Sequence, residues 1–350
     1  MQENQETEAL LGRREFMSKA AKAAMLASTA VAAGGLMDGY LAGGTASAAT
    51  KKALFPMKLQ LPWLENVQAA GEFIAESKGY YGKNGLNVTL LSGGPNVSIE
   101  PVVVAGTAFV GLSSADVVAR ARLEGAPLKI IGAQYQKNPY TVISSAHHPI
   151  KSPQGLVGKT IGVSASNLTV YNVMLKLNHI DPSKVTRVPV QFDPTPLVDG
   201  EVDAWLGYIS SDAVTLKLKG FPIYTFLLSD FGYHIWGDVY ETTEDRIDKY
   251  RDQLISFLAA ERQGWNLDIK NPQLGDTLTV TKYGKNLGLT LKSCLLQSEE
   301  QVPLMVTSDT RQNGLFWMSN AGQAQNIATM KIAGVNAYQD LFDNSLLAEL

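Results

Sequence analysis

The chain has a single cysteine, Cys294, among its 350 residues, so it forms neither an internal disulfide nor a cysteine-based metal cluster. It has only four histidines, and none has the His-x-x-x-His or Glu-flanked spacing of a zinc helix. It also lacks an excess of positive charge, with 30 lysines and arginines against 33 aspartates and glutamates. We therefore expect no metal site, no nucleic-acid surface and no basic face for direct membrane insertion.

Motifs for catalysis and for nucleotide binding are missing as well. There is no P-loop and no complete G-x-G-x-x-G, and residues 162–166 (GVSAS) lack the second glycine of a nucleophile elbow. The Gly-rich turn at 92–96 (SGGPN) is too short to hold a nucleotide, although it suits close approach of a ligand to the backbone. The sequence thus predicts no enzyme and no cofactor.

The N-terminal segment is typical of an export signal. Arg13 and Arg14 precede a weakly apolar, Ala/Gly-rich stretch at 23–40, and residues 46–48 (ASA) offer a small-residue cleavage site. We predict a twin-arginine signal peptide over residues 1–48, with an N-terminal helix that happens to contain two arginines as the alternative. No cysteine follows for lipid attachment, and no other segment is apolar over the roughly 20 residues of a membrane span. We expect a mature protein that is free in the periplasm.

Short apolar runs alternate with helical patterns in the rest of the chain, which favours βαβ units and parallel sheets. A proline-marked break near residue 150 suggests that the chain builds one lobe, crosses to a second, and returns to the first with C-terminal helices. We predict an α/β fold of two lobes, each a mostly parallel sheet flanked by helices, with a two-strand hinge. Lobe I would comprise 52–145 and 244–350, and lobe II 146–243. The predicted strands cover 57–61, 87–91, 108–112, 128–134, 141–145, 160–164, 186–191, 204–208, 223–228 and 237–243.

Two segments resemble each other, 105–118 (AGTAFVGLSSADVV) and 199–214 (DGEVDAWLGYISSDAV). Each has a Gly-led turn, a strand with an internal glycine, and then two serines and an aspartate that open a helix. Ligands of parallel sheets bind beyond the carboxyl ends of the strands, where helix starts present free N–H groups. The repeat therefore predicts a polar cleft between facing lobes, although Ser-Ser-Asp sequences also serve as plain N-caps.

Aromatic residues gather at or just past the predicted strand ends and crossovers. Buried sites for small organic molecules consist mostly of such rings, together with a few polar groups that fix orientation. Each ring is also a candidate for the core. The set comprises Trp63, Tyr135, Tyr140, Trp205, Tyr208, Phe231, Tyr233 and Trp236.

Residues 61–95 (LPWLENVQAAGEFIAESKGYYGKNGLNVTLLSGGP) resemble the start of periplasmic solute-binding proteins of ABC importers. The similar subgroup is the NMT1/THI5-like one, which is related to the thiamin-pyrimidine synthase of fungi and also includes aliphatic-sulfonate and nitrate binders. Further similar blocks lie at 152–163, 197–208 and 229–247. The resemblance implies a type II periplasmic binding-protein fold that closes over one small molecule and delivers it to a permease and its ATPase. We expect the protein to act as a monomer.

In the pyrimidine-binding members of this family the first strand is followed by Trp-x-x-Asn and then a histidine. Trp63 and Asn66 match, which implies that Trp63 stacks on a planar ring and Asn66 hydrogen-bonds its edge. Ala69 stands at the histidine position, and the Cys-rich motif of the fungal synthase is absent. We therefore predict a receptor, and not an enzyme, for a planar heteroaromatic solute such as a pyrimidine vitamin precursor or a flavin-like molecule. The predicted ligand-binding residues are Trp63, Tyr208 and Trp236 for stacking, and Asn66, Asn96, Ser114, Ser166, Asn167, Asp193 and Asp230 for polar contacts.

Alternatives to this hypothesis remain open. Asp193 would accept from an amino-pyrimidine and repel a sulfonate, but an N-cap is the other interpretation of its position. A sulfonate or nitrate receptor would bind its ligand at the helix start formed by Ser164, Ser166 and Asn167, although no arginine is at hand there. An exported enzyme or a sensory receptor on the same fold is the third possibility.

Overall fold

Two five-stranded sheets organise the structure, a computed structural model that describes residues 53–191 and 193–350. We call the first sheet, of order β2-β1-β3-β10-β4, and its helices the first lobe, and the second, of order β7-β6-β8-β5-β9, and its helices the second lobe. The strands are β1 (Phe55–Gln60), β2 (Leu86–Leu91), β3 (Val110–Ser113), β4 (Leu128–Tyr135), β5 (Tyr140–Ser145), β6 (Thr160–Ser164), β7 (Thr186–Val190), β8 (Ala204–Tyr208), β9 (Ile223–Leu227) and β10 (Gly237–Thr243).

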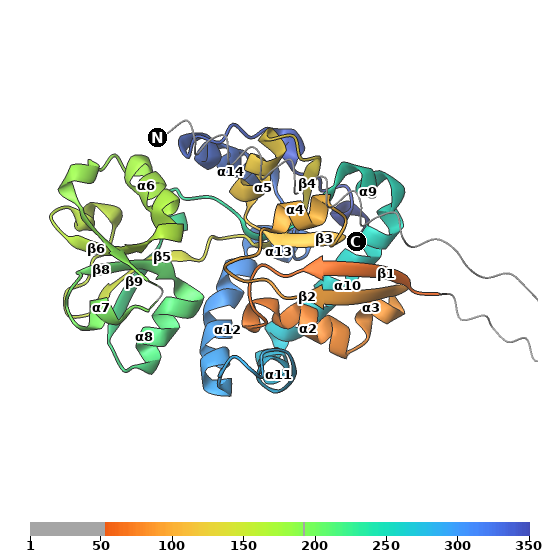
Figure 1. The fold of residues 1–350 in the computed structure, drawn as a ribbon, viewed down its shortest axis with the longest axis horizontal. Coiled ribbons are helices and arrows are strands. Elements are labelled where there is room, and N and C mark those ends of the chain that lie inside the picture. The colour runs from red at the N-terminus through yellow and green to blue at the C-terminus, as the bar shows by residue number, and fades with distance from the viewer. Residues whose placement is uncertain (1–52, 192) are drawn as a thin grey trace, which may run out of the picture. The chain divides into compact units, whose positions relative to one another are not determined.

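The two sheets have the same topology. In the first, β1 pairs in parallel with β2 and β3, whereas β10 lies antiparallel between β3 and β4. In the second, β6 pairs in parallel with β7 and β8, whereas β5 lies antiparallel between β8 and β9. The antiparallel strand of each sheet is the one that arrives from the other lobe, since β5 follows β4 and β10 follows β9 (Figure 1). The predicted two-lobed α/β fold is confirmed, with mixed sheets.

The predicted strands all form, with bounds that differ from the prediction by at most two residues at either end. The two resembling segments take equivalent places, because their strands β3 and β8 each stand third in their sheet. The crossing strands have exchanged lobes relative to the predicted boundaries, since β5 lies in the second sheet and β10 in the first. We therefore propose lobe boundaries in the loops at 136–139 and 232–236, each one strand earlier than predicted.

Helices cover both faces of the first sheet because its strands alternate apolar side chains toward each face. Tyr240 packs with α2 and α10, whereas its neighbour Val239 faces the side of α5 and α14. The predicted helical C-terminal part is present as α9 to α14. The helices are α2 (Ala70–Ser77), α3 (Tyr80–Lys83), α4 (Ile99–Val104), α5 (Ala115–Leu123), α6 (Leu168–Leu177), α7 (Thr195–Val198), α8 (Val214–Leu218), α9 (Glu244–Lys249), α10 (Arg251–Lys270), α11 (Pro272–Leu278), α12 (Leu291–Met305), α13 (Ser308–Asn313) and α14 (Asn320–Ile332).

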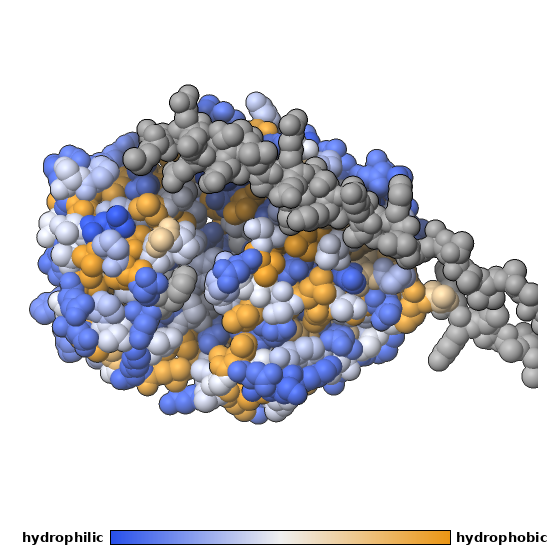
Figure 2. All heavy atoms as spheres, in the orientation of Figure 1, coloured by the Kyte–Doolittle hydropathy of each residue, from blue (hydrophilic) through white to orange (hydrophobic). Residues whose placement is uncertain are grey.

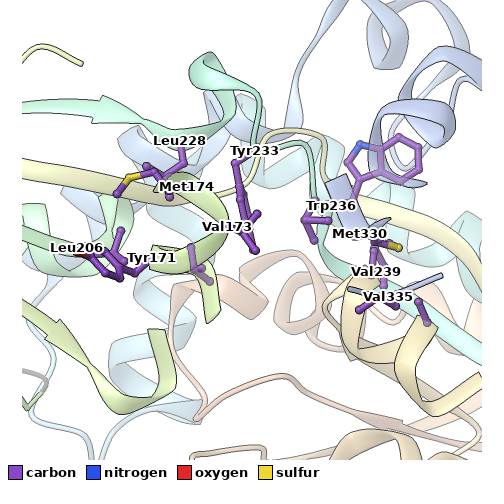
Figure 3. Close-up of a cluster of buried hydrophobic side chains, with 14 of the residues drawn as sticks. Tyr171, Val173, Met174, Leu206, Leu228, Tyr233, Trp236, Val239, Met330 and Val335 are labelled. Atoms are coloured by element: carbon purple, nitrogen blue, oxygen red, sulfur yellow. The ribbon is translucent and has the colours of Figure 1, made fainter. Parts of the chain in front are cut away.

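Apolar packing continues from one lobe to the other along the connector before β10. Figure 3 shows Tyr171 and Met174 of α6 near one end of this row of side chains and Met330 of α14 toward the other, with Tyr233 and Trp236 of the connector between them. Helices add two polar links between the lobes. The Nζ of Lys176 donates to the backbone oxygen of Ile332 at 3.1 Å, and Lys217 of α8 forms an ion pair with Glu300 of α12.

On the face shown in Figure 2, hydrophobic and hydrophilic residues are interspersed. Within residues 53–191 and 193–350, no helix combines the length and the apolar character that crossing a bilayer requires.

The crossing of α2 and α10 is the tightest helix contact of the first lobe. A Cβ at Gly264 would overlap the backbone oxygen of Gly71, and a Cβ at Gly71 would overlap the indole of Trp265. Trp265 is fully buried. Glycine at both positions thus lets the two helix backbones approach closely. This close approach buries the side chains around the crossing.

We predict that Gly264→Ala lowers the free energy of unfolding by about 2 kcal/mol, because a methyl group there must push the two helices apart. Gly82→Ala is the matched control, since a Cβ at Gly82 meets nothing within 4 Å. That variant should be unchanged or more stable by up to about 1 kcal/mol, because alanine favours a helix over glycine. Urea denaturation measures both, and equal stabilities of the two variants would contradict the close crossing.

Candidate functional site

Asp238, the second residue of the crossing strand β10, has a buried carboxyl group and a strained backbone. Its side chain is 7% exposed and its backbone has a φ of +47°, in the left-handed region that few side chains adopt. Its Oδ2 accepts a hydrogen bond of 2.7 Å from Nε2 of Gln68. Burial raises the pKa of Asp238 to about 7, and the bond from Gln68 opposes this rise only in part. A strained, buried acid with a shifted pKa is typical of functional sites.

Gln68 is fixed from three sides. Its backbone N–H donates to Oδ1 of Asn66 at 2.9 Å, which caps the short turn at Val67–Ala69. Its backbone oxygen accepts from Nε2 of Gln134 in β4 at 3.0 Å, and its side chain holds Asp238. Asn66, predicted to contact ligand, thus uses its amide oxygen to support Gln68.

The second lobe contributes tyrosines at the strand ends. Tyr140 opens β5 and Tyr208 closes β8, and their rings meet edge to face with centroids 4.6 Å apart. Tyr233, in the connector, lies edge-on to Tyr140 at 6.3 Å. The Tyr140 hydroxyl donates to Oδ1 of Asn167 at 3.1 Å, while Nδ2 of Asn167 donates to the backbone oxygen of Leu206 at 3.3 Å.

Negatively charged groups of the first lobe contribute to the raised pKa values of Tyr140 and Tyr208. Burial and the negative charge of Asp116 raise the pKa of Tyr140 to about 12. Burial raises the pKa of Tyr208 well above its usual range, and the nearby charges of Tyr140 and Asp238 add to this effect. The phenols therefore remain neutral hydrogen-bond donors at physiological pH. We call Asp238, Gln68, Tyr140, Tyr208 and Asn167 the Asp238 site.

Four other predicted residues lie in the loops that follow strands or precede helices. Ser114 occupies the N-cap position of α5, but its hydroxyl donates to Oδ1 of Asp116 at 2.7 Å and does not cap the helix. Ser166 is exposed after β6, with its hydroxyl 3.0 Å from that of Ser164. Trp63 is 37% exposed in the loop after β1, and Asn96 is exposed in the turn before α4.

Trp236 does not lie where the sequence placed it. It is 4% exposed, its ring lies against Gly322 and 5.4 Å from the ring of Phe342, and its backbone N–H donates to Asn326 at 2.7 Å. The connector turns this indole into the core under α14 before β10 begins. We therefore assign Trp236 to the core and correct its expected stacking role.

Asp193 and Asp230 are engaged in surface interactions. Asp193 accepts from the N–H of Thr195 at 3.1 Å and pairs with Lys219 at 3.0 Å, so the capping interpretation describes it. Asp230 pairs with Lys137 at 3.5 Å, and both side chains are about half exposed. Neither carboxylate belongs to the Asp238 site.

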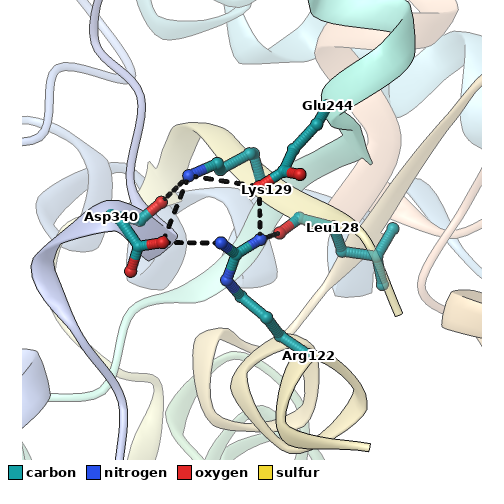
Figure 4. Close-up of polar contacts among 5 residues, drawn as sticks. All are labelled: Arg122, Leu128, Lys129, Glu244 and Asp340. Atoms are coloured by element: carbon teal, nitrogen blue, oxygen red, sulfur yellow. Dashed lines mark hydrogen bonds and ion pairs between the residues drawn. The ribbon is translucent and has the colours of Figure 1, made fainter. Parts of the chain in front are cut away.

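Two surface hollows lie away from the Asp238 site. One, of about 320 Å³, is lined by α5 and the segment 336–341, next to an ion-pair network of Arg122, Lys129, Glu244 and Asp340 (Figure 4). The other, of about 470 Å³, lies along the edge strand β7 and includes Asp193. Within the described residues, no three His, Cys, Asp or Glu side chains are arranged to hold a metal ion.

Asp238 and Gln68 are not among the ligand-binding residues predicted from the sequence. The available signal for Asp238 was an acid directly after a glycine at the start of a predicted crossing strand. For Gln68 there was no signal, because its role depends on the capped turn and on a strand 170 residues away in sequence.

Comparison with known proteins identifies the family of this chain. The family model described as NMT1/THI5 like matches residues 66–274, which is more than half of the chain. The chain belongs to the NMT1/THI5-like family. The matched range begins at Asn66 and contains every residue of the Asp238 site.

Two curated proteins are similar to this chain over most of its length, and a third over less than half of it. A riboflavin-binding protein from Chloroflexus aurantiacus is 24% identical over 79% of this chain and 80% of its own length. A formylaminopyrimidine-binding protein from Halalkalibacterium halodurans is 25% identical over 77% of this chain and 82% of its own. A 4-amino-5-hydroxymethyl-2-methylpyrimidine phosphate synthase from Legionella pneumophila is 24% identical, over 45% of this chain and 51% of its own.

Solved structures of other proteins have the same fold as this chain. The periplasmic aliphatic sulphonate binding protein SsuA from Escherichia coli superposes with a TM-score of 0.60 at 14% identity, over 81% of this chain and 92% of its own. The desulfurization enzyme DSZB superposes with a TM-score of 0.56 at 13% identity, over 84% and 98%. Both binding proteins and an enzyme thus use this architecture, so the fold alone does not decide between them.

We predict that Asp238→Asn makes the protein more stable than the wild type at alkaline pH. The pKa of Asp238 is raised on folding, so its contribution to stability is present below pH 4 and is lost as pH rises through about 7. Asparagine keeps the acceptor for Gln68 and tolerates the left-handed backbone. The advantage of the variant in urea denaturation should grow between pH 4 and 7, to at most about 4 kcal/mol, and stay constant above.

Asp230→Asn is the control for this measurement. Its exposed ion pair with Lys137 should contribute at most about 1 kcal/mol. Parallel stability curves of Asp238→Asn and wild type from pH 4 to 9 would contradict the burial of an unpaired carboxyl group at Asp238.

Proposed function

We propose that this protein is the periplasmic substrate-binding component of an ABC importer and that it captures a small planar heteroaromatic solute at the Asp238 site. The observation that supports this most is the buried, strained Asp238 carboxyl, held by Gln68 and within electrostatic range of Tyr208 of the other lobe. A ligand between the lobes would contact both at once and favour their closure. Binding energy that depends on both lobes is what a capturing receptor needs.

The chemistry of the Asp238 site suits the edge and the faces of a heteroaromatic ring. A carboxyl group that titrates near pH 7 offers a donor and an acceptor side by side when it is protonated, and two acceptors when it is not. An amino-pyrimidine edge has a ring nitrogen acceptor next to an amino donor. The protonated carboxyl group can therefore donate to the ring nitrogen and accept from the amino group, and the ionised carboxylate can accept from the amino group. Tyr208 and, from the loop after β1, Trp63 provide rings for stacking.

A sulfonate or nitrate receptor is the less favoured candidate. Asp238 and Asp116 make the electrostatic surroundings of the tyrosines negative, which opposes an anion. The side-chain oxygens expected to hold an anion head group already interact within the protein, Ser166 with Ser164 and Asn167 with Tyr140. Among the described residues, no arginine side chain forms a hydrogen bond or an ion pair with a residue of the Asp238 site.

A binding role, and not catalysis, is part of the proposal. Two curated relatives that match along most of the chain are named as binding proteins, whereas the relative named as a synthase matches less than half of it. The Asp238 site contains neither histidine nor cysteine, and Ala69 stands where the synthase pattern has histidine. Turnover of any bound compound by the purified protein would overturn this part.

The proposed cellular role requires export and partners. We propose that the twin-arginine signal at 1–48, which lies outside the described residues, directs the protein to the periplasm. There it would deliver its ligand as a monomer to a permease and ATPase. A gene neighbourhood with a sensor kinase and no permease would favour the sensory alternative.

A thermal-shift screen tests the ligand class. The probes are riboflavin, formylaminopyrimidine, 4-amino-5-hydroxymethyl-2-methylpyrimidine, an alkanesulfonate and nitrate. A ligand at 100 times its Kd stabilises the folded state by about 2.7 kcal/mol, which shifts the unfolding temperature by several degrees. We predict that one of the three heteroaromatic probes gives such a shift and that the two anions do not; the reverse pattern would favour the anion receptor.

The best probe then tests the Asp238 site. Tyr208→Ala should weaken its binding at least about tenfold, because a stacked ring contributes on the order of 1 kcal/mol beyond its buried area. Tyr338→Ala is the comparison variant, since Tyr338 is 69% exposed and lines the hollow beside Arg122 and Asp340. Isothermal titration calorimetry measures both, and a Tyr208→Ala variant with the affinity of the wild type would place the ligand elsewhere.

A further inference from the structure

The α2–α10 crossing of the first lobe encloses four carboxyl groups. Glu72 of α2, Glu261 and Asp268 of α10, and Asp276 of α11 all have fully buried side chains. Glu261 and Asp268 lie two helical turns apart and so share one face of α10, with Trp265 between them. We call these four acids the carboxyl array; none of them belongs to the Asp238 site, although the charge of Asp238 contributes to the raised pKa of Glu72.

Hydrogen bonds satisfy only part of the array. Tyr81 donates to Oε1 of Glu261 at 2.5 Å, and Tyr240 donates to Oε1 of Glu72 at 3.1 Å and to Oε2 of Glu261 at 3.4 Å. Ser298 of α12 donates to Oδ1 of Asp276 at 2.7 Å. The second oxygen of Asp276 and both oxygens of Asp268 have no hydrogen-bond partner among the described residues. The second oxygen of Glu72 has none at hydrogen-bond distance, although the indole N–H of Trp265 lies near enough to lower the pKa of Glu72.

Positive charge does not reach the array from the elements that pack on it. Arg262 of α10 donates to the backbone oxygen of Leu315, and Lys282, which follows α11, pairs with Glu76 at 3.7 Å. Lys270, at the end of α10, is exposed. The remaining ionisable groups near the array are the tyrosines Tyr81, Tyr135 and Tyr240, the thiol of Cys294 beside Asp276, and Asp238.

Four ionised carboxylates without a counter-charge would be very costly inside a protein core. A bound metal ion could neutralise these charges, but no group of three acidic, histidine or cysteine ligands converges in the described residues. The other way to neutralise the carboxyl groups is to protonate them. A protonated carboxyl also becomes a donor, which allows one array member to bond to another or to a neighbouring backbone oxygen.

We propose that the carboxyl array is a proton-binding site that makes the first lobe a pH-sensitive element. At neutral pH the array holds protons that the unfolded chain would release, and alkaline pH removes them and destabilises the packing of α2 against α10. The glycine contact at Gly71 and Gly264 leaves little room for water to solvate the resulting charges. This proposal does not depend on which ligand the protein binds.

The direction of each shift agrees with this arrangement. Burial raises the pKa of Glu72 to about 7, that of Asp268 to about 8 and that of Asp276 to about 6, and it raises the pKa of Glu261 well above its usual range. A raised pKa in the folded state favours folding at low pH, and this contribution is lost as pH rises through the shifted values. Stability should therefore fall between about pH 4 and pH 8 and beyond.

Infrared spectroscopy of the whole protein in D2O tests the protonation directly. Protonated carboxyl groups have a carbonyl stretch that ionised ones lack, and exposed acids are ionised at pD 7. We expect this band to persist at pD 7 in the wild type and to lose intensity in Glu72→Gln, which has the same shape without the titrating group. Glu124→Gln, at an exposed position of the same lobe, should leave the band unchanged.

Thermal unfolding supplies the second readout. For each extra proton held by the folded state, the unfolding equilibrium constant rises about tenfold per pH unit. The unfolding temperature of the wild type should fall steadily from pH 6 to 9, and Glu72→Gln should flatten this dependence relative to Glu124→Gln. The proposal is overturned if the wild type shows no carboxylic-acid band at pD 7, a result that does not require any variant to fold, or if Glu72→Gln and Glu124→Gln share one pH profile.

Discussion

The exchange of one strand between the two sheets is the constraint on which the rest of this structure depends. Each five-stranded sheet has three neighbouring strands joined in parallel, then an antiparallel strand that has just come from the other lobe, and then an edge strand, β4 or β9. Because β5 and β10 are inserted between other strands and not added at an edge, neither lobe is complete without the crossing chain. The start of each crossing strand consequently lies next to the carboxyl ends of its neighbours, where ligands of such sheets bind. Tyr140 and Asp238 occupy these two starts.

This placement explains why Asp238 is both strained and buried. The chain must turn from the connector, whose Trp236 enters the core, into a ladder with β3 and β4 on either side. Asp238 absorbs the turn with a left-handed backbone, and the hydrogen bond from Gln68 holds its carboxyl in place. The first lobe contains further buried acids around the α2–α10 crossing, and these are the groups that we propose make its core sensitive to protonation.

The sequence predicted the fold well because its signals are local. Strands such as β6 and β8 are short apolar runs bounded by turns, and the resemblance between 105–118 and 199–214 reflects the matched positions of β3 and β8. The candidate site was predicted less well because its residues are defined by contacts far apart in sequence. Trp236, at the end of the connector, and Asp238, at the start of β10, are two positions apart, yet the indole enters the core and the carboxyl group meets Gln68. Asn66 matched a family pattern, but the pattern does not show that its amide oxygen caps the turn that presents Gln68.

A crystal structure with the heteroaromatic probe that stabilises the protein most would show directly whether the ligand binds at the Asp238 site. We expect an edge of the ring to lie within hydrogen-bond distance of the Asp238 carboxyl group and a face of the ring to pack against Tyr208. A ring bound instead in the hollow along β7 or in the one beside Arg122 and Asp340, with Asp238 bonded to Gln68 alone, would contradict it.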